Sequence, residues 1–346
     1  MMVWKGGGRG MAGVNKVAEG VYRIRIKGPI GDVGHVNLYL IEGGDEATLV
    51  DAGFFSSADE ILDAVETVLG PGFRINRIII THLHYDHYGS ASQLAARLST
   101  EVLLHEREKI IAKIIEDIRL DKERTLVKLL QLPERVAEKV YKVIQREVEI
   151  YPKHVKEIEG DTVIRSKSGR WRPIHTPGHT PGHLCLFNEE AGVLISGDHL
   201  LPSETSNIAY YPIKDYNPLL EFLQSLKLVE KLNPKLLLPS HGDAFTDASR
   251  RVSFLFQHHE KRLQEVMQGI MEEKSITGAA RHVKWSRGDF ENLSDFDKWL
   301  AVLETLSHAE FLAYCGVAER RIDKTLTYSI VDSSFEKVLE KLHAIR

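Results

Sequence analysis

The chain is poor in cysteine and has no long hydrophobic run. Its 346 residues include two cysteines, Cys185 and Cys315, each in an apolar stretch, whereas a secreted disulfide framework needs more of them. No segment approaches the roughly 20 apolar residues that span a membrane. Residues 1–16 are rich in glycine and lack the apolar segment of a signal peptide, so we expect a flexible tail there. These absences predict a cytoplasmic protein without a membrane partner.

The chain also lacks an excess of basic residues. It has 45 Lys and Arg against 49 Asp and Glu, a net charge of -4. Proteins that bind nucleic acid through bulk electrostatics are usually basic, so a nucleic-acid partner is not expected. The sequence contains neither a GxSxG nucleophile elbow nor a GxxxxGK[ST] phosphate loop. Its chemistry must therefore rest on other residues.

The spacing of apolar residues predicts an α/β protein. Short alternating segments between residues 21 and 50 are typical of a β-meander, and helical spacing follows at 56–69. An apolar strand at 77–81 ends directly in a histidine cluster. Strands return between 161 and 197, followed by a helix at 218–232 and a strand at 235–238. We predict a main domain at 17–250 and a mainly helical region at 251–346, with a β-hairpin at 320–331.

Residues 106–157 differ from the rest of the main domain. Isoleucines recur at helical spacing from Ile110 to Ile118, and charges of both signs lie between them. We interpret this segment as a helical insertion that forms a lid beside the site. The isoleucines are expected only to pack against the core.

Metal-binding residue types are concentrated in the segment THLHYDH, residues 81–87. In an extended turn, residues two apart face the same side, so His82 and His84 can hold one metal. Asp86 and His87 then point toward a neighbouring position. Imidazole and carboxylate suit zinc and comparable divalent ions. Four ligands do not complete a site for two metals, so others must come from elsewhere in the chain.

Further candidates lie at the ends of predicted strands. His179 is in HTPGHTPGH, Asp198 in SGDH and His241 in PSHG. Asp51, in LVDAG, is another acidic residue at a strand end. Each motif alone is a weak signal, because an aspartate before glycine is also ordinary turn chemistry.

Taken in order, Asp51, the HxHxDH run, His179, Asp198 and His241 resemble the five motifs of the metallo-β-lactamase superfamily. The resemblance covers about residues 20–243 and implies a four-layer αβ/βα sandwich with two metals at one edge of two facing sheets. It implies that the first metal is bound by His82, His84 and His179. It implies that the second is bound by Asp86, His87 and His241, that Asp198 bridges both, and that Asp51 orients a ligand.

This resemblance implies a metal-dependent hydrolase. A hydroxide held between two divalent cations would attack an ester, thioester, lactone or phosphoester. We expect Zn²⁺, with Fe, Mn or Co as alternatives, and we count Asp86 and Asp198 as catalytic residues. A metal-dependent RNA nuclease and a mononuclear iron enzyme similar to persulfide dioxygenases are the alternative functions. The expected partners are a small-molecule substrate and a second copy of the chain in a homodimer.

Four residues near the motifs are secondary candidates. His183 and His199 neighbour predicted ligands, and each could equally be a hydrogen-bonded structural histidine. Tyr210 and Tyr211 follow the Asp198 loop and could reach the substrate, although aromatic packing is the commoner role of tyrosine.

The regions around residues 197–208, 219–232 and 258–263 are similar to glyoxalase II-like hydrolases that carry a winged-helix-like region at the C-terminus. The predicted helix at 295–315 carries Asp295, Asp297, Glu304 and Glu310 against Lys298 alone. A helix that binds DNA or RNA should be positive. We therefore interpret residues 251–346 as a cap over the active site.

Overall fold

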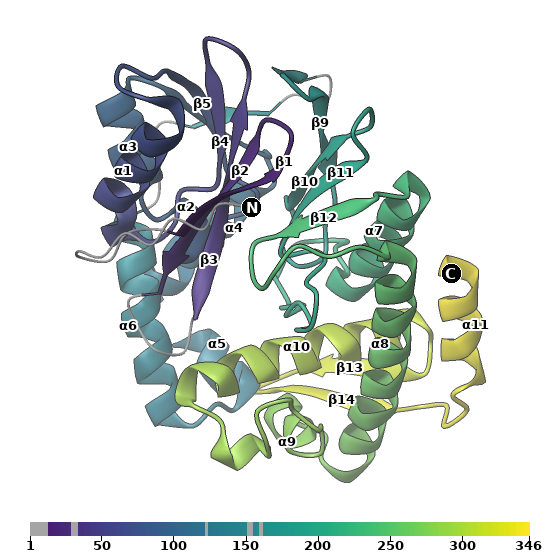
Figure 1. Cartoon of the computed structure of the whole chain (residues 1–346). Helices are drawn as coiled ribbons and strands as arrows, with labels where there is room; N and C mark the ends of the chain where they lie inside the picture. Colours follow the sequence, from purple (N-terminus) through teal and green to yellow (C-terminus); the bar gives the residue numbers. More distant parts are fainter. Residues whose placement is uncertain (1–12, 29–33, 122–123, 151–154, 159–161) are drawn as a thin grey trace.

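Two facing β-sheets form the centre of the fold (Figure 1). The computed structural model describes residues 13–28, 34–121, 124–150, 155–158 and 162–346. The first sheet, in spatial order, consists of β1 (Gly13–Ala18), β2 (Val21–Lys27), β3 (His35–Glu42), β4 (Ala47–Val50), β5 (Ile75–Ile79), β6 (Glu101–Leu104) and β7 (Lys156–Glu157). The second consists of β12 (Leu236–Pro239), β11 (Val193–Gly197), β10 (Leu184–Asn188), β9 (Gly169–His175) and β8 (Ile164–Ser166).

Alternation of side chains along the strands determines which layer each residue joins. On β3, Tyr39 and Ile41 belong to the apolar cluster between the two sheets. Their neighbours Leu38 and Leu40 belong to a second cluster, which includes residues of the helices outside the first sheet. This period of two is the geometry of an extended strand buried on both faces.

Helices cover the outer face of each sheet (Figure 1). Helices α1 (Ala58–Leu69) and α3 (Ala91–Leu98) pack outside the first sheet, and α7 (Pro218–Leu232) and α8 (Ala248–Glu272) outside the second. Helix α7 begins where the Asn217 side chain accepts a hydrogen bond from the Leu220 N–H, with Pro218 at its first position. The predicted four-layer αβ/βα sandwich is confirmed.

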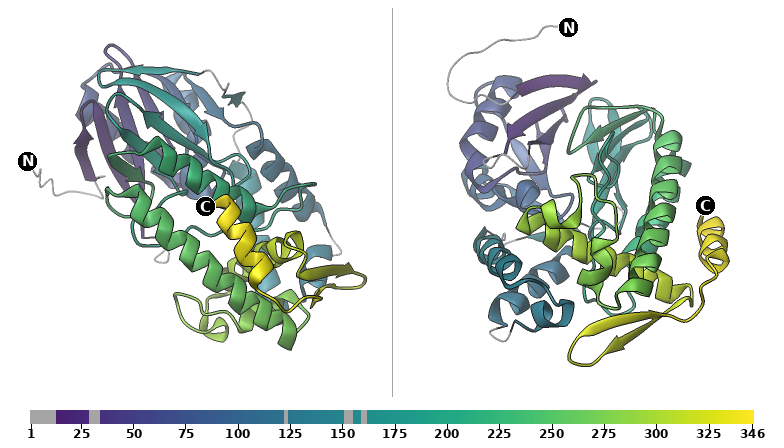
Figure 2. Two further views of the ribbon diagram at one scale, coloured as in Figure 1. Left: turned by 90° about the vertical axis from the view of Figure 1, so that its right-hand side faces the viewer. Right: turned by 90° about the horizontal axis from the view of Figure 1, so that it is seen from below.

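The insertion and the C-terminal region pack together at one end of the sandwich (Figures 1 and 2). The insertion contains α4 (Glu108–Leu120), α5 (Thr125–Leu130) and α6 (Glu134–Ile150). The C-terminal region contains α9 (Ile276–Arg281), α10 (Asp295–Tyr314), the hairpin β13 (Ala318–Ile322) and β14 (Leu326–Ile330), and α11 (Glu336–Ile345). The predicted hairpin and long helix are therefore present. No helix in the described ranges is long and apolar enough to cross a membrane.

The predicted flexible tail at residues 1–16 is wrong for its last residues. Strand β1 begins at Gly13 and pairs antiparallel with β2, with Val14 opposite Ile24. The backbone of β1 hydrogen-bonds the edge of β2, and the Val14 side chain packs against the core. Residues 1–12 lie outside the described residues.

Candidate metal centre

The predicted ligands lie at one edge of the sandwich, after the carboxyl ends of strands. His82 follows β5, His179 follows β9, Asp198 directly follows β11 and His241 follows β12. Strands β4 and β5 run parallel, as do β11 and β12. Parallel strands end at the same edge of a sheet, which is where open α/β sheets place their sites.

Three imidazole nitrogens of the first cluster converge on one point. His82 Nε2 lies 3.0 Å from His84 Nδ1 and 3.2 Å from His179 Nε2, and His84 Nδ1 lies 3.0 Å from His179 Nε2. Nitrogens bound tetrahedrally to zinc are about 3.3 Å apart, given Zn–N distances near 2.05 Å. The spacing of the three rings therefore fits a single metal ion.

Hydrogen bonds on the far side of the rings determine which nitrogens carry protons. His179 Nδ1 lies 2.8 Å from the Asn207 carbonyl oxygen, which can only accept, so this nitrogen is the donor. The Thr81 hydroxyl lies 3.0 Å from both Asp51 Oδ2 and His82 Nδ1. It donates to the carboxylate and accepts from the ring. The converging nitrogens of His82 and His179 consequently present lone pairs to one another, an arrangement that a cation stabilises.

The acidity of these rings agrees with that assignment. Burial, with the nearby imidazoles, lowers the pKa of His82 well below its ordinary value. Burial and His179 lower the pKa of His84 to about 3. Both rings are therefore neutral at neutral pH, which is the form that binds a metal.

Asp86, His87 and His241 form the second cluster, with their ligand atoms within 4.8 Å of one another. His241 Nδ1 donates to the His35 carbonyl oxygen at 2.7 Å, so its Nε2 faces Asp86 Oδ2 at 3.4 Å. His87 Nδ1 donates to Asp51 Oδ2 at 2.9 Å. His87 Nε2 is buried without a hydrogen bond to any described residue, and points into the cluster. This set also fits a divalent cation.

Negative charge dominates this second half of the centre. Burial opposes a charge on His87, yet Asp86, Asp198 and Asp51 raise its pKa to about 9. Carboxylates that stabilise a protonated imidazole also attract a metal ion.

Asp198 faces both clusters at once. Its Oδ1 lies 3.5 Å from His241 Nε2 and 3.7 Å from His87 Nε2. Its Oδ2 lies 3.6 Å from His179 Nε2 and 3.9 Å from His82 Nε2. Burial opposes ionisation, but the surrounding histidines, His241 first, hold the pKa of Asp198 well below its usual value. The position fits a carboxylate shared between two metal ions.

Asp51 and His183 lie behind the ligands and hold them. Asp51 accepts from the Thr81 N–H at 2.8 Å as well as from the hydroxyl of Thr81 and His87 Nδ1. His183 Nε2 accepts from the Asp198 N–H at 3.1 Å. A Cβ at Gly197, where φ is +52°, would lie 2.5 Å from that same Nε2, so only glycine permits this close approach. Both residues are placed to orient ligands.

His199 occupies a different environment from His183. Its ring is completely buried and lies against Phe222. Burial lowers its pKa to about 3. The ring is therefore a packed, neutral imidazole, and a role of His199 in orienting a ligand stays a prediction.

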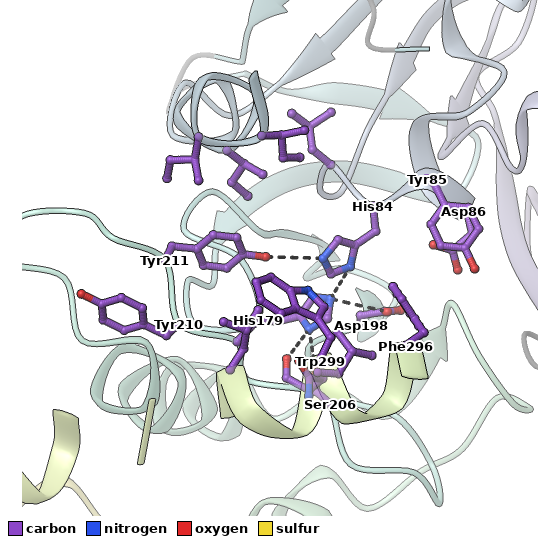
Figure 3. A pocket seen from close by; sticks show the side chains of 18 of the residues that line it. His84, Tyr85, Asp86, His179, Asp198, Ser206, Tyr210, Tyr211, Phe296 and Trp299 are labelled. Atoms are coloured by element: carbon purple, nitrogen blue, oxygen red, sulfur yellow. Dashed lines mark hydrogen bonds and ion pairs between the residues drawn. The ribbon is translucent and has the colours of Figure 1, made fainter. Parts of the chain in front are cut away.

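The two tyrosines differ in orientation (Figure 3). The Tyr211 hydroxyl is directed at His84, 3.5 Å from its Nε2. The Tyr210 hydroxyl is directed away from His84 in the same view. Both rings line the pocket, but Tyr211 alone of the two directs its hydroxyl toward the clusters.

A buried glutamate that the sequence did not indicate joins two ligand loops. Glu108, the first residue of α4, is completely buried. Its carboxylate accepts from the Leu83 N–H, between His82 and His84, and from the Thr180 hydroxyl and Gly182 N–H, after His179; all three distances are 2.7 Å. Burial raises its pKa to about 7. No metal-binding motif includes Glu108, so a pattern search could not find it.

The His241 turn is likewise held by residues outside the motifs. The Asn37 side chain donates to the carbonyl oxygens of Pro239 and Gly242, and the Tyr39 hydroxyl donates to Pro239 at 2.7 Å. These bonds connect β3 of the first sheet to a turn of the second. They hold the two halves of the centre together across the sandwich.

The C-terminal region reaches the first cluster through a buried chain of polar contacts. Arg262 of α8 lies 3.2 Å from Glu304 of α10. Glu304 accepts from the Asn207 side chain at 2.9 Å, and the Asn207 backbone accepts from His179. The region therefore supports a predicted ligand, and its role as a cap stays a prediction.

The four acidic residues of α10 lie in ion pairs with arginines. Each acid has an arginine partner from another part of the chain, and the expectation that nucleic acid is not a partner stays a prediction. These pairs are Asp295–Arg135, Asp297–Arg287, Glu304–Arg262 and Glu310–Arg320.

Replacing Arg262 by Met should lower the free energy of unfolding by about 3 kcal/mol, because Glu304 would remain buried without its counter-charge. Adding Glu304→Gln should recover most of that loss. Urea titration measures both changes. The matched control is Arg250→Met, an exposed arginine on the same helix, which should change stability by less than about 0.5 kcal/mol. A loss no larger than the control would contradict the role of the buried pair.

A cavity of about 330 Å³ opens at the two clusters. His84, Asp86, His179, Asp198 and His241 lie among its lining residues. Its other walls include isoleucines of α4 and apolar residues of α10. The expectation that the isoleucine stripe only packs against the core is therefore wrong. Helical spacing predicts an apolar face, but not whether that face meets protein or a cavity.

The Metallo-beta-lactamase superfamily profile matches residues 31–241. The chain belongs to this superfamily. The match includes all seven predicted ligands, and the membership makes the chain a metal-dependent hydrolase. It thereby explains why histidines and carboxylates converge at this edge of the sandwich.

Other superfamily proteins resemble the chain over most of its length. It is 27% identical to "Probable metallo-hydrolase YqjP" of Bacillus subtilis, over 85% of this chain and 92% of that one. A metallo-beta-lactamase family protein from Thermus thermophilus is 27% identical, with a TM-score of 0.74 over 91% of this chain and 100% of its own. A beta-lactamase domain protein from Burkholderia ambifaria is 26% identical, with a TM-score of 0.77 over 92% and 94%. The likeness thus extends beyond the motif region into the C-terminal region.

Proposed function

We propose that the chain is a binuclear hydrolase that cleaves an ester, thioester, lactone or phosphoester. The observation that carries the proposal is the position of Asp198, whose two oxygens each face one cluster of ligand atoms. His82, His84 and His179 would hold one metal ion, and Asp86, His87 and His241 the other. Two bound cations would lower the pKa of water and polarise the substrate oxygen.

Residues behind the proposed metal ligands hold the ligand side chains in fixed orientations. Asp51 and His183 orient His87 and Asp198, while Glu108 holds the loops of the first cluster. Fixed ligands keep their lone pairs on the metal positions without reorganisation during the reaction. Zinc is the metal we propose, because imidazole and carboxylate ligands in this number suit it. We also propose that the chain is a cytoplasmic homodimer and that it belongs to the glyoxalase II-like group.

Metal content per chain tests this proposal. Elemental mass spectrometry on protein purified without added metal should find about two zinc ions per chain, since two complete ligand sets are present. One iron per chain would instead support the persulfide dioxygenase alternative and contradict the binuclear hydrolase. Two metals with cleavage of structured RNA, and no hydrolysis of small esters, would support the nuclease.

Replacing Tyr211 by Phe should lower kcat by about 10- to 100-fold, if its hydroxyl donates to the oxygen that becomes negative in the transition state. KM and thermal stability should change little. Tyr210→Phe is the matched control, because its hydroxyl is directed away from His84. Steady-state kinetics on a hydrolysed ester gives both values. Equal effects of the two variants would contradict a specific role for Tyr211.

A further inference from the structure

Two helices present matching apolar stripes to the pocket. Ile111, Ile114, Ile115 and Ile118 of α4 line it, at the i, i+3, i+4, i+7 spacing that places side chains on one helix face. The lining residues of α10 from Phe296 to Leu303 follow the same spacing. Three of the four isoleucines are only half buried by the protein. They therefore offer apolar surface that an apolar ligand group would cover.

The isoleucine stripe starts next to the loop that carries His82 and His84. Glu108 attaches the first turn of α4 to the loop of His82 and His84 through the Leu83 N–H. Along the helix, Ile111 is therefore the nearest of the four to this attachment and Ile118 the farthest. Seven residues of helix extend about 10 Å, so the stripe offers a channel of about that length.

No lysine or arginine is among the described residues that line the pocket. Its charged lining residues outside the histidines are Asp86, Asp198 and Glu204. Binding sites for phosphate usually supply Arg or Lys donors. Figure 3 shows Phe296, Trp299 and Tyr211 bordering the same pocket as His84 and His179. The surroundings of the centre thus favour a substrate without phosphate groups near the bond that is cleaved.

We propose that the channel binds the aliphatic chain of an acyl ester or thioester, with its carbonyl group at the metal centre. This inference rests on the proposed hydrolase function and narrows its substrate class. A stripe of about 10 Å accommodates an extended chain of about eight carbons. Water attacks the carbonyl carbon, the bond to the alcohol or thiol breaks, and a carboxylic acid and the alcohol or thiol are released.

Chain-length dependence tests the inference. Nitrophenyl esters from acetate to dodecanoate should show kcat/KM rising by about fourfold per methylene, the value of burying one methylene group. The rise should end near eight carbons. Ile118→Trp should reduce kcat/KM only for the longest acyl chains. Ile115→Trp should reduce kcat/KM for shorter acyl chains as well. Ile110→Trp is the matched control on the same helix, because Ile110 is exposed and is not among the lining residues.

A second measurement does not depend on turnover or metal. Calorimetry on the metal-free protein should show octanoate binding at least about 100-fold more tightly than butyrate, since four more methylenes are buried. Ile115→Trp should abolish this preference, and Ile110→Trp should keep it. Metal-dependent hydrolysis with neither chain-length dependence nor octanoate preference would overturn the inference and leave the hydrolase proposal intact. Octanoate preference without hydrolysis of any ester would support the channel and contradict the proposed reaction.

Discussion

Replacing Asp198 by Asn is expected to lower turnover by about 10³-fold, the upper range for removing one group that stabilises a transition state. The two carboxylate oxygens face different clusters, and an amide offers lone pairs from its oxygen alone. The variant should therefore bind a metal ion at one position and lose the metal ion at the other. Metal content should fall from about two ions per chain to about one.

The measurement combines elemental mass spectrometry with ester hydrolysis on the same protein samples. Asp243→Asn is the matched control: Asp243 lies two residues after His241, but its carboxylate pairs with Arg23 and Arg25 and its side chain is 79% exposed. This control should keep both metals and its activity. If Asp198→Asn retained two metals and most of its turnover, the bridging assignment would be wrong.

The position of the predicted ligands at strand ends could be derived from the sequence, whereas their assignment to two metal ions came from the resemblance to the superfamily. His82, Asp198 and His241 each follow an apolar strand, and the strand pattern places such residues at a sheet edge. Their order along the chain then identified the superfamily. The four-layer architecture followed from the same resemblance, and the profile match and the solved relatives agree with it.

Contacts between distant segments could not be predicted in this way. Arg262 and Glu304 are 42 residues apart in sequence, and neither belongs to a metal motif. A charge count gives the net charge of α10 but not the arginines that neutralise it. Strand β1 was missed for a related reason: glycine-rich sequence next to it indicated a tail, while its stability comes from pairing with β2.

The isoleucines of α4 also show what spacing along the chain cannot predict. Their spacing correctly indicates a helix with one apolar face. Whether such a face contacts the core or a ligand depends on where the helix begins. That position is set by Glu108, whose partners lie 25, 72 and 74 residues away in sequence.

Glu108 is accordingly the second residue whose replacement we expect to have a large effect. Replacing it by Ala should lower the free energy of unfolding by about 3–5 kcal/mol, because three buried donors lose their acceptor and each costs about 1–3 kcal/mol. The lower part of the summed range is expected, since water can enter the space that the side chain leaves. Glu108→Gln keeps one acceptor oxygen and should lose less than half as much.

Urea titration in the presence of a chelator measures this effect on the metal-free protein, so that metal binding does not contribute to the stability. Glu106→Ala is the matched control, an exposed glutamate two residues earlier, and should change stability by less than about 0.5 kcal/mol. The loop of His82 and His84 and the loop after His179 share Glu108 as an acceptor. Its loss should therefore also weaken zinc binding by about 10- to 100-fold, as removal of residues that orient ligands does. Reduced stability with unchanged zinc affinity would show that Glu108 holds α4 in place without positioning the ligands.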